Sequence, residues 1–322
     1  MPFSNELLSN AARNIRVKSV ESDFEYAEEL IYNALAVMVN ANPLIDPEQV
    51  EIYIHGSYAN NLNIFFPSNL EIVVELKKTL EFDPDDALEQ GYKIHGNYFV
   101  DLGLEFGVAD FRAQLFAILE HQLGSKCYES EKTIVVLSHK HLKHNIEITP
   151  CFSFKYINEA SDKIFPGVVL HDASVGGDIV TFPRLHESNG HSKDLATDDN
   201  FKPIVRMFKT LSMIGEREFD FPLTRGYFIQ CLLFNVPNNL FMVRDGLLNQ
   251  LIDDPGYALN QIFLKVINYL DNCNMENFMC QNTVWRLFGN AAEFWDIASA
   301  KTFVKNMQKM YNHFPESRTK LA

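Results

Sequence analysis

The stretch from His55 to Leu76 constrains the fold more than any other, because it joins a tight turn to an alternating segment. Residues 50–54 are predicted to form a strand that leads into a turn at Gly56-Ser57. A second strand is predicted to follow, with alternate side chains on opposite faces. One face would carry Asn69, Glu71, Val73 and Glu75, and the other Leu70, Ile72, Val74 and Leu76.

The turn and the polar face of the second strand suit binding of a metal and a phosphate. A Gly-Ser turn offers backbone N–H groups to a triphosphate without side-chain obstruction. Asn69 and Glu71, two residues apart, place two oxygen ligands side by side, as Mg²⁺ requires. Taken alone, an ordinary turn followed by a solvated strand face explains the same residues and is the commoner case.

A second alternating stretch, from Asn145 to Phe152, supplies a further carboxylate. Asn145, Glu147 and Thr149 share one predicted face, so Glu147 would lie on a strand able to pair beside Asn69 and Glu71. An exposed strand glutamate is the alternative. The preceding run SHKHLKH is interpreted as a solvated strand edge or turn, with a metal role for His139 and His141 as the alternative.

Composition limits the class of protein. The chain has 322 residues, 47% of them hydrophobic, and a net charge of −14. This predicts a folded protein that does not bind long double-stranded DNA. Five scattered cysteines, with Cys231 expected as a buried thiol, fit a reducing cytosol. The first residues lack an apolar signal core, and no apolar run of membrane-spanning length occurs, so we expect a cytoplasmic protein without membrane association.

The remaining pattern predicts a mixed α+β chain with a helical second half. Residues 158–200 are interpreted as loop-rich, with turns around Pro183, and the boundary between lobes is placed near residue 185. A strand is predicted over 133–137, and helices are predicted over 4–16, 23–40, 110–124, 201–215, 223–235, 241–253, 257–272, 281–288 and 291–314.

Two features of the helical half point to a nucleotide. Lys202, Arg206 and Lys209 share one face of a predicted helix, which suggests an anion site in an acidic protein; ordinary solvation is the alternative. Tyr227, near the start of the next helix, offers a flat ring to a base, with a core aromatic as the alternative.

Five motifs in order give the chain a family resemblance: GSY, PSNLEIVV, NIEITP, FKPIVRMFK and RGYFIQCLLFNVP. In this order they resemble the cGAS/DncV-like nucleotidyltransferases, enzymes of bacterial cyclic-oligonucleotide antiphage (CBASS) signalling. The resemblance runs from about Glu21 to Phe314. It implies a bilobal, polymerase-beta-like α+β fold, with a nucleotidyltransferase catalytic lobe and bracing N-terminal helix over 1–185. A helical nucleotide-binding lobe would occupy 186–322.

The resemblance also implies roles for single residues. Gly56 and Ser57 match the triphosphate-binding turn, and Lys209, helped by Lys202, matches the lysine that grips the triphosphate. Tyr227 matches the ring that stacks on a base. Asn69, Glu71 and Glu147 match the acidic catalytic and metal-binding triad for Mg²⁺, with Mn²⁺ as the alternative ion. The implied substrates are NTPs, and the expected protein partner is an effector or regulator of the same defence system.

Five positions depart from the family pattern. Asn69 and Glu71 stand where the family has Asp-x-Asp, and Glu147 replaces the third Asp. Gly226 replaces a serine, and Gln230 replaces a glutamate. These departures leave two main hypotheses. One is a metal-dependent synthase that joins NTPs into a cyclic di- or oligonucleotide; the other is a catalytically silent fold that senses a nucleotide or a partner. A template-independent transferase acting on RNA or protein is a third, weaker hypothesis.

Overall fold

The computed structural model describes residues 12, 19–42, 45–64, 68–82, 94–95, 99–100, 106–158, 163–242, 255–289 and 295–313. Apart from Ala12, the predicted helix over 4–16 lies outside these ranges, as does most of the one over 241–253. The chain divides into two compact units. The sheet unit comprises Arg16–Asn60 and Pro67–Leu185, and the helical unit comprises Met1–Ile15, Asn61–Phe66 and His186–Ala322. The assignment of 1–185 and 186–322 as two functional lobes stays a prediction.

The sheet unit is built on three long neighbouring strands. These are β2 (Leu70–Phe82), β7 (Ile146–Asn158) and β8 (Lys163–Asp172). β1 (Val50–His55) pairs antiparallel with β2, β2 pairs parallel with β7, and β7 pairs antiparallel with β8. Within the described ranges the path runs β1-β2-β7-β8-β9-β4-β3, and β6 pairs with β7 and β5. The smaller strands are β3 (Ile94–His95), β4 (Phe99–Val100), β5 (Cys127–Glu129), β6 (Ile134–Val136) and β9 (Gly177–Thr181).

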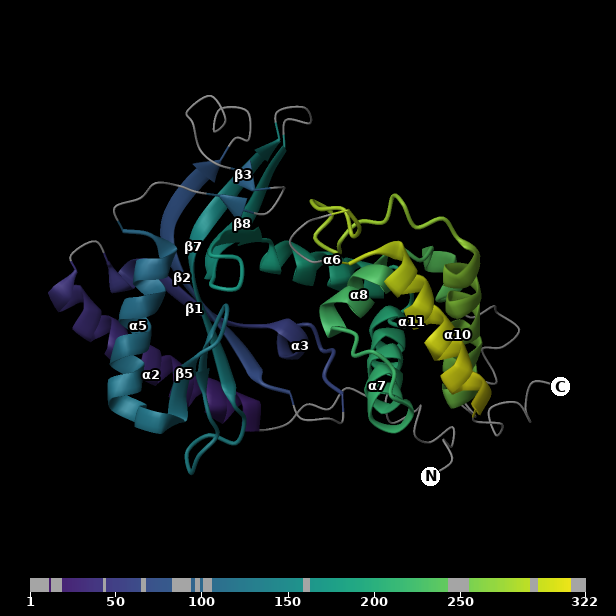
Figure 1. Ribbon diagram of the computed structural model, residues 1–322, viewed down its shortest axis with the longest axis horizontal. Coiled ribbons are helices and arrows are strands. Elements are labelled where there is room, and N and C mark those ends of the chain that lie inside the picture. Colours follow the sequence, from purple (N-terminus) through teal and green to yellow (C-terminus); the bar gives the residue numbers. More distant parts are fainter. Residues whose placement is uncertain are drawn as a thin grey trace. The chain divides into compact units, whose positions relative to one another are not determined.

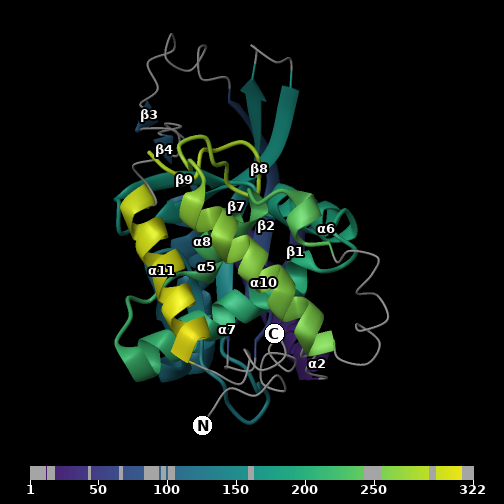
Figure 2. The same ribbon diagram turned by 90° about the vertical axis from the view of Figure 1, so that its right-hand side faces the viewer.

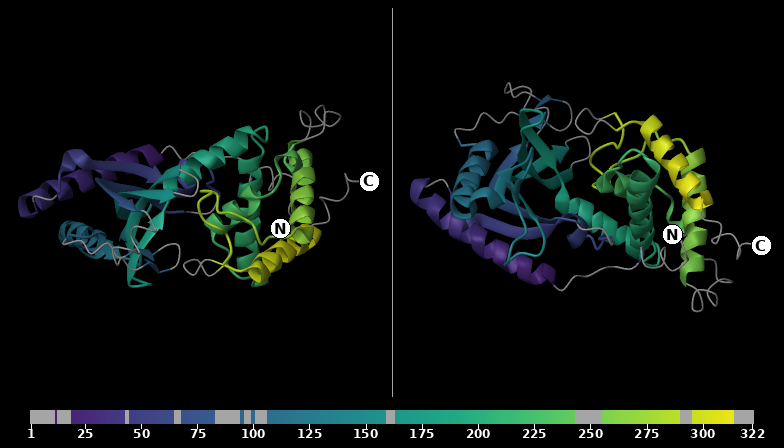
Figure 3. Two further views of the ribbon diagram at one scale, coloured as in Figure 1. Left: turned by 90° about the horizontal axis from the view of Figure 1, so that it is seen from above. Right: turned by 60° about the horizontal axis from the view of Figure 1, so that its bottom comes forward.

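Two helices cover one face of this sheet (Figures 1 and 3). α2 (Ser19–Ala41) and α5 (Val108–Leu123) contact each other, α2 contacts β2, and α5 contacts β7. The apolar face of β2 supplies the core: Leu70, Ile72 and Val74 are fully buried. The ring of Phe111 on α5 lies 5.8 Å from that of Phe152 on β7. The alternating pattern thus has the predicted consequence, since burial of one face turns Glu71 and Glu147 to the other.

The prediction that residues 158–200 form loops is wrong. Besides β8 and β9, this region contains the helix α6 (Pro183–Leu195). Pro166 and Gly167 lie inside β8 and pair with Lys155 and Phe154. A Cβ on Gly167 would lie 2.8 Å from the Phe182 ring, so glycine there serves close packing. Pro183 is the first residue of α6, where proline is favoured because no intrahelical N–H is needed.

The helical unit packs around aromatic side chains. Its main helices are α7 (Phe201–Phe219), α8 (Gly226–Phe234), α10 (Pro255–Asn272) and α11 (Ile297–His313), visible in Figure 2. α7 contacts each of the other three, and α10 contacts α11. The Phe208 ring of α7 lies 4.5 Å from Phe263 of α10 and 6.2 Å from Phe303 of α11. Cys231 on α8 is fully buried, as predicted.

The helix predicted over 281–288 is absent, and that prediction is wrong. Turns replace it, because the Asn282 side chain accepts hydrogen bonds from the backbone N–H groups of Val284 and Trp285. Asparagine used in this way competes with helix formation. In the described ranges, no helix is both long and apolar enough to cross a membrane.

Candidate active site

The two predicted carboxylates lie directly opposite each other on neighbouring strands. Glu71 of β2 is the register partner of Glu147 of β7 in the parallel pair. Asn69, just before β2, donates a hydrogen bond from Nδ2 to Oε1 of Glu147 at 2.5 Å. The backbone aligns them, since Leu70 N–H donates to the carbonyl of Asn145 at 2.8 Å. The structure therefore brings together all three residues of the predicted metal set.

Gly56 brings the predicted turn against the same carboxylate. It has φ +68°, and a Cβ built there would lie 2.3 Å from the carboxylate atoms of Glu71. A side chain at position 56 would require a strained left-handed backbone and displacement of the Glu71 carboxylate. The turn continues as one helical turn, α3 (Gly56–Ala59), which contains Ser57. The Asn60 side chain donates to the Gly56 carbonyl at 2.9 Å and closes the turn.

His55 stands beside this turn as the register partner of Glu71 on β1. Burial lowers the pKa of His55 to about 4, so its imidazole is neutral at neutral pH. It therefore adds no positive charge next to the Glu71 carboxylate.

A polar contact ties the turn and β7 to helix α2. Asp23, only 1% exposed, accepts hydrogen bonds from the backbone N–H of Lys143 and His144. Its Oδ2 also lies 2.7 Å from Nδ1 of His144. The His144 ring meets Tyr58 of the turn edge-on at 5.7 Å. One buried aspartate thus links α2 to both the turn and the segment that leads into Glu147.

The donor set fits a hard divalent cation. Two like charges directly opposite on a sheet repel each other, and a cation between them removes that cost. Two carboxylates and an amide oxygen are ligands of the kind that Mg²⁺ or Mn²⁺ takes. The Asn69 amide nitrogen faces Glu147 here, so its oxygen would reach a cation only after the amide turns over.

The histidine run forms no comparable site. His139 and Leu142 form an isolated bridge, and the His139 and His141 rings lie 5.6 and 5.8 Å from that of Tyr26. Across the described ranges, no three His, Cys, Asp or Glu side chains are grouped as metal ligands. The interpretation as a turn is confirmed.

In the helical unit, two of the three cations of α7 are buried and Lys209 is half-buried. Arg206 is 6% exposed and donates to the carbonyls of Ala12 and, at 2.6 Å, of Asn61. Burial lowers the pKa of Arg206 to about 10. Lys202 is 8% exposed, and Lys209 Nζ donates to the carbonyl of Leu62 at 2.9 Å. Ordinary solvation, the alternative to an anion site, therefore does not describe this helix face. The nucleotide-binding roles of Lys202 and Lys209 stay predictions.

Tyr227 is half-buried in an aromatic and polar group of the same unit. Its ring stacks on that of His186 at 4.8 Å, with 30° between the planes. His186 Nε2 lies 2.7 Å from Oε1 of Gln230, the residue that departs from the family's glutamate. Gly226 sits against Lys209, since a Cβ there would lie 3.1 Å from Cε of that lysine. Stacking of Tyr227 on a base stays a prediction.

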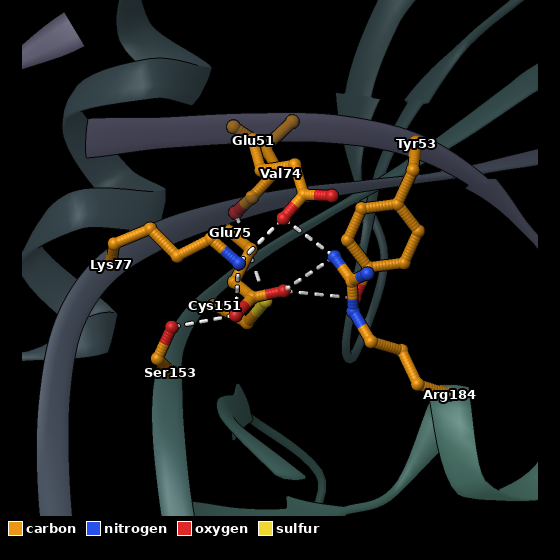
Figure 4. Close-up of polar contacts among 8 residues, drawn as sticks. All are labelled: Glu51, Tyr53, Val74, Glu75, Lys77, Cys151, Ser153 and Arg184. Atoms are coloured by element: carbon orange, nitrogen blue, oxygen red, sulfur yellow. Dashed lines mark hydrogen bonds and ion pairs between the residues drawn. The ribbon is translucent and has the colours of Figure 1, made fainter. Parts of the chain in front are cut away.

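The sequence pattern does not reveal a second polar group on the sheet, which Figure 4 shows. We call it the Glu75 cluster. Glu75 shares the predicted polar face with Asn69 and Glu71, and Arg184 falls in the turn predicted around Pro183, but their spacing gives no sign that they meet. The members come from β1, β2, β7 and the start of α6, and they are Glu51, Tyr53, Glu75, Lys77, Ser153 and Arg184.

In comparisons with known proteins, the chain is similar to members of one family of nucleotidyltransferases. Residues 188–312 match the family model for the cGAS/DncV-like nucleotidyltransferase C-terminal helical domain. A cyclic nucleotide synthase of Staphylococcus haemolyticus is 26% identical over 285 residues, covering 85% of this chain and 89% of that protein. A cyclic UMP-AMP synthase of Rhodothermus marinus is 27% identical over 266 residues, covering 81% and 84%.

Solved structures agree on the fold. The CdnE c-UMP-AMP synthase of Rhodothermus marinus, solved with Apcpp and Upnpp, superposes with a TM-score of 0.73 at 23% identity, covering 97% of this chain and 98% of that one. The CdnE cyclic dinucleotide synthase of Elizabethkingia meningoseptica, solved with GTP and Apcpp, gives 0.72 at 22% identity, covering 96% and 99%. The expected mixed α+β, polymerase-beta-like fold is confirmed.

Proposed function

We propose that this chain, which belongs to the cGAS/DncV-like nucleotidyltransferase family, joins NTPs into a cyclic di- or oligonucleotide. The observation that carries the proposal is the Glu71–Glu147 pair, in register on parallel strands with Asn69 bonded to Glu147. The names of the relatives support the product class. A role for the product as a second messenger in antiphage defence rests on the family resemblance.

Each residue of the site has its own proposed role in this reaction. Glu71, Glu147 and the Asn69 oxygen would hold Mg²⁺ or Mn²⁺, and the bound ion would supply charge neutralisation of the triphosphate and activation of a hydroxyl. The turn at Gly56 and Ser57 binds the triphosphate with backbone N–H groups. Glu147 accepts the proton of the acceptor ribose hydroxyl. The hydroxyl oxygen attacks the α-phosphorus in line, the new P–O bond forms, and the bond to pyrophosphate breaks.

Incubation with all four labelled NTPs and Mg²⁺ or Mn²⁺ tests the proposal. The wild type should release pyrophosphate and form a phosphatase-resistant product. Glu71→Gln and Glu147→Gln should each lower turnover by at least about a hundredfold, because one carboxylate is left to hold the metal. Glu120→Gln, the same charge change on an exposed position of α5, is the control. Full activity in Glu71→Gln would show that the metal pair is misassigned.

A second candidate function has its own supporting observation. The Asn69–Glu147 hydrogen bond satisfies part of the site without a cation. A silent fold that senses a nucleotide would keep this bond. It would bind NTP equally with and without divalent metal, and it would release no pyrophosphate in the same assay.

A further inference from the structure

The Glu75 cluster is drawn in Figure 4. Glu71 and Glu75 lie on one face of β2, as Glu147 and Ser153 do on β7. Glu75 follows Glu71 by four positions, which is about 13 Å along a strand. The Glu75 cluster is therefore a separate group on the face that carries the metal pair.

Glu75 organises this cluster as a buried anion. It is 4% exposed and accepts hydrogen bonds from Ser153 Oγ at 2.6 Å, Tyr53 Oη at 3.1 Å and Lys77 Nζ at 3.1 Å. Arg184 Nη2 lies 3.5 Å from its Oε2. Burial and the nearby Glu75 charge raise the pKa of Tyr53, so its hydroxyl remains a donor. The carboxylate oxygens of Glu75 therefore already have partners, and Glu75 holds Lys77 and Arg184 in place.

Both cations retain capacity for another anion. Glu51 and Glu75 take two of the three N–H groups of Lys77. The same two glutamates contact Arg184 through Nη2 alone, while its guanidinium lies 4.4 Å above the Tyr53 ring. The hydrogen bond to Glu51 raises the pKa of Arg184. Burial opposes a rise in the pKa of Lys77, but the bonds to Glu51 and Glu75 outweigh it. Both side chains are therefore charged at neutral pH.

A cavity of about 380 Å³ opens beside these cations. Among the described residues, its lining includes the three cations Lys77, Lys155 and Arg184 and one carboxylate, Glu75. The volume falls within the range of small-molecule sites.

The lining also includes apolar residues, namely Pro166 and Val168 of β8 and Pro183 of α6. A ligand that fits this mixed lining carries a compact anion and a flat or apolar group. We propose that the cavity binds a small phosphate-bearing molecule, with its phosphate among Lys77, Lys155 and Arg184. Arginine and lysine together suit phosphate, the first through its fork geometry and the second as a point charge.

Calorimetric titration of the full chain with AMP and, separately, with inorganic phosphate tests this site. Lys155→Gln and Arg184→Gln should each weaken AMP binding by about tenfold, because each removes one charge-assisted contact. Lys126→Gln, the same change on an exposed lysine of the sheet unit, should leave binding unchanged. Circular dichroism melts of each variant exclude loss of fold, and Lys155→Arg should restore binding.

Each possible result of these titrations either supports or contradicts the proposed phosphate site. Tighter binding of AMP than of inorganic phosphate, with loss in Lys155→Gln, assigns an organic phosphate. Equal affinities with the same loss assign inorganic phosphate. The absence of heat with either probe at millimolar concentration, or equal affinity in Lys155→Gln and Lys126→Gln, overturns the site and leaves the cluster as a clamp on α6. Glu147→Gln should retain the Lys155-dependent binding, so this test is independent of pyrophosphate release.

Discussion

The Asn69 side chain donates its amide hydrogen to the Glu147 carboxylate at 2.5 Å, across two neighbouring strands of the sheet. An aspartate at position 69 would instead face Glu147 with a like charge, and the repulsion would need a cation to relieve it. The asparagine therefore makes the site less dependent on metal for its stability and weaker as a metal site.

Asn69→Asp should increase the response of the protein to divalent metal. The third carboxylate raises metal affinity and turnover, and it lowers thermal stability in EDTA because three carboxylates repel each other. We expect a larger rise in Tm on addition of Mg²⁺ or Mn²⁺, and a lower metal concentration for half-maximal pyrophosphate release, than in the wild type. Asn268→Asp, an exposed isosteric change on α10, should behave as wild type. An unchanged metal response in Asn69→Asp would contradict the assignment of this position.

Gly56→Ala should destabilise the protein and abolish turnover. Gly176→Ala is a matched control, because both glycines have left-handed backbones, φ +68° and +66°, but a Cβ on Gly176 meets nothing within 4 Å. We expect Gly176→Ala to cost about 1 kcal/mol and to retain activity. Gly56→Ala should cost about 2 kcal/mol more, since the new methyl group displaces the Glu71 carboxylate. Urea denaturation measures both, and equal costs would refute the close approach of Glu71.

Lys209→Ala should weaken NTP binding by about 1–3 kcal/mol in calorimetry. Lys265→Ala controls for the loss of a bond to the backbone, because Lys265 Nζ donates to the Met242 carbonyl as Lys209 Nζ donates to that of Leu62. Both variants remove a lysine from the helical unit, and only Lys209→Ala is expected to affect the nucleotide. Equal affinities in the two variants would remove Lys209 from the nucleotide site and make Lys202 the next candidate.

Lys193 should make stability rise with pH. The residue is 8% exposed, and its ammonium lies near three phenylalanine rings and donates to the Val236 carbonyl and to Asn238 Oδ1. Burial lowers its pKa from 10.5 to about 8. Between these values the unfolded chain binds more protons than the folded one, so the free energy of unfolding rises with pH over this window.

The size of that rise is on the order of 2 kcal/mol. Lys193→Met should remove it, whereas Lys163→Met, at an exposed position on β8, should keep it. Urea denaturation of the three proteins at pH 7.5 and at higher pH values up to the ordinary lysine pKa measures the difference. A rise of the same size in Lys193→Met would show that other groups cause it.

The local alternation of apolar and polar residues predicted the two strands that carry Glu71 and Glu147. Burial of Leu70, Ile72 and Val74 requires that Glu71 face the other way, and the same period-2 constraint places Glu147. The order of the motifs predicted the family and the mixed α+β fold. Patterns failed where a side chain competes with the backbone, as at Asn282, and where turn-rich composition concealed strands and a helix, as over residues 158–200.

Tertiary structure alone decided which polar groups meet. Nothing in the spacing of Glu75, Ser153 and Arg184 along the chain indicates that they converge, because strand pairing brings together residues about a hundred positions apart. For the α7 cations the sequence likewise left an anion site and solvation open, since a helix face shows which residues share it but not which backbone carbonyls approach it. A sequence determines local periodicity through steric and hydrophobic rules. The partners of a buried charge are determined only when the chain has folded around it.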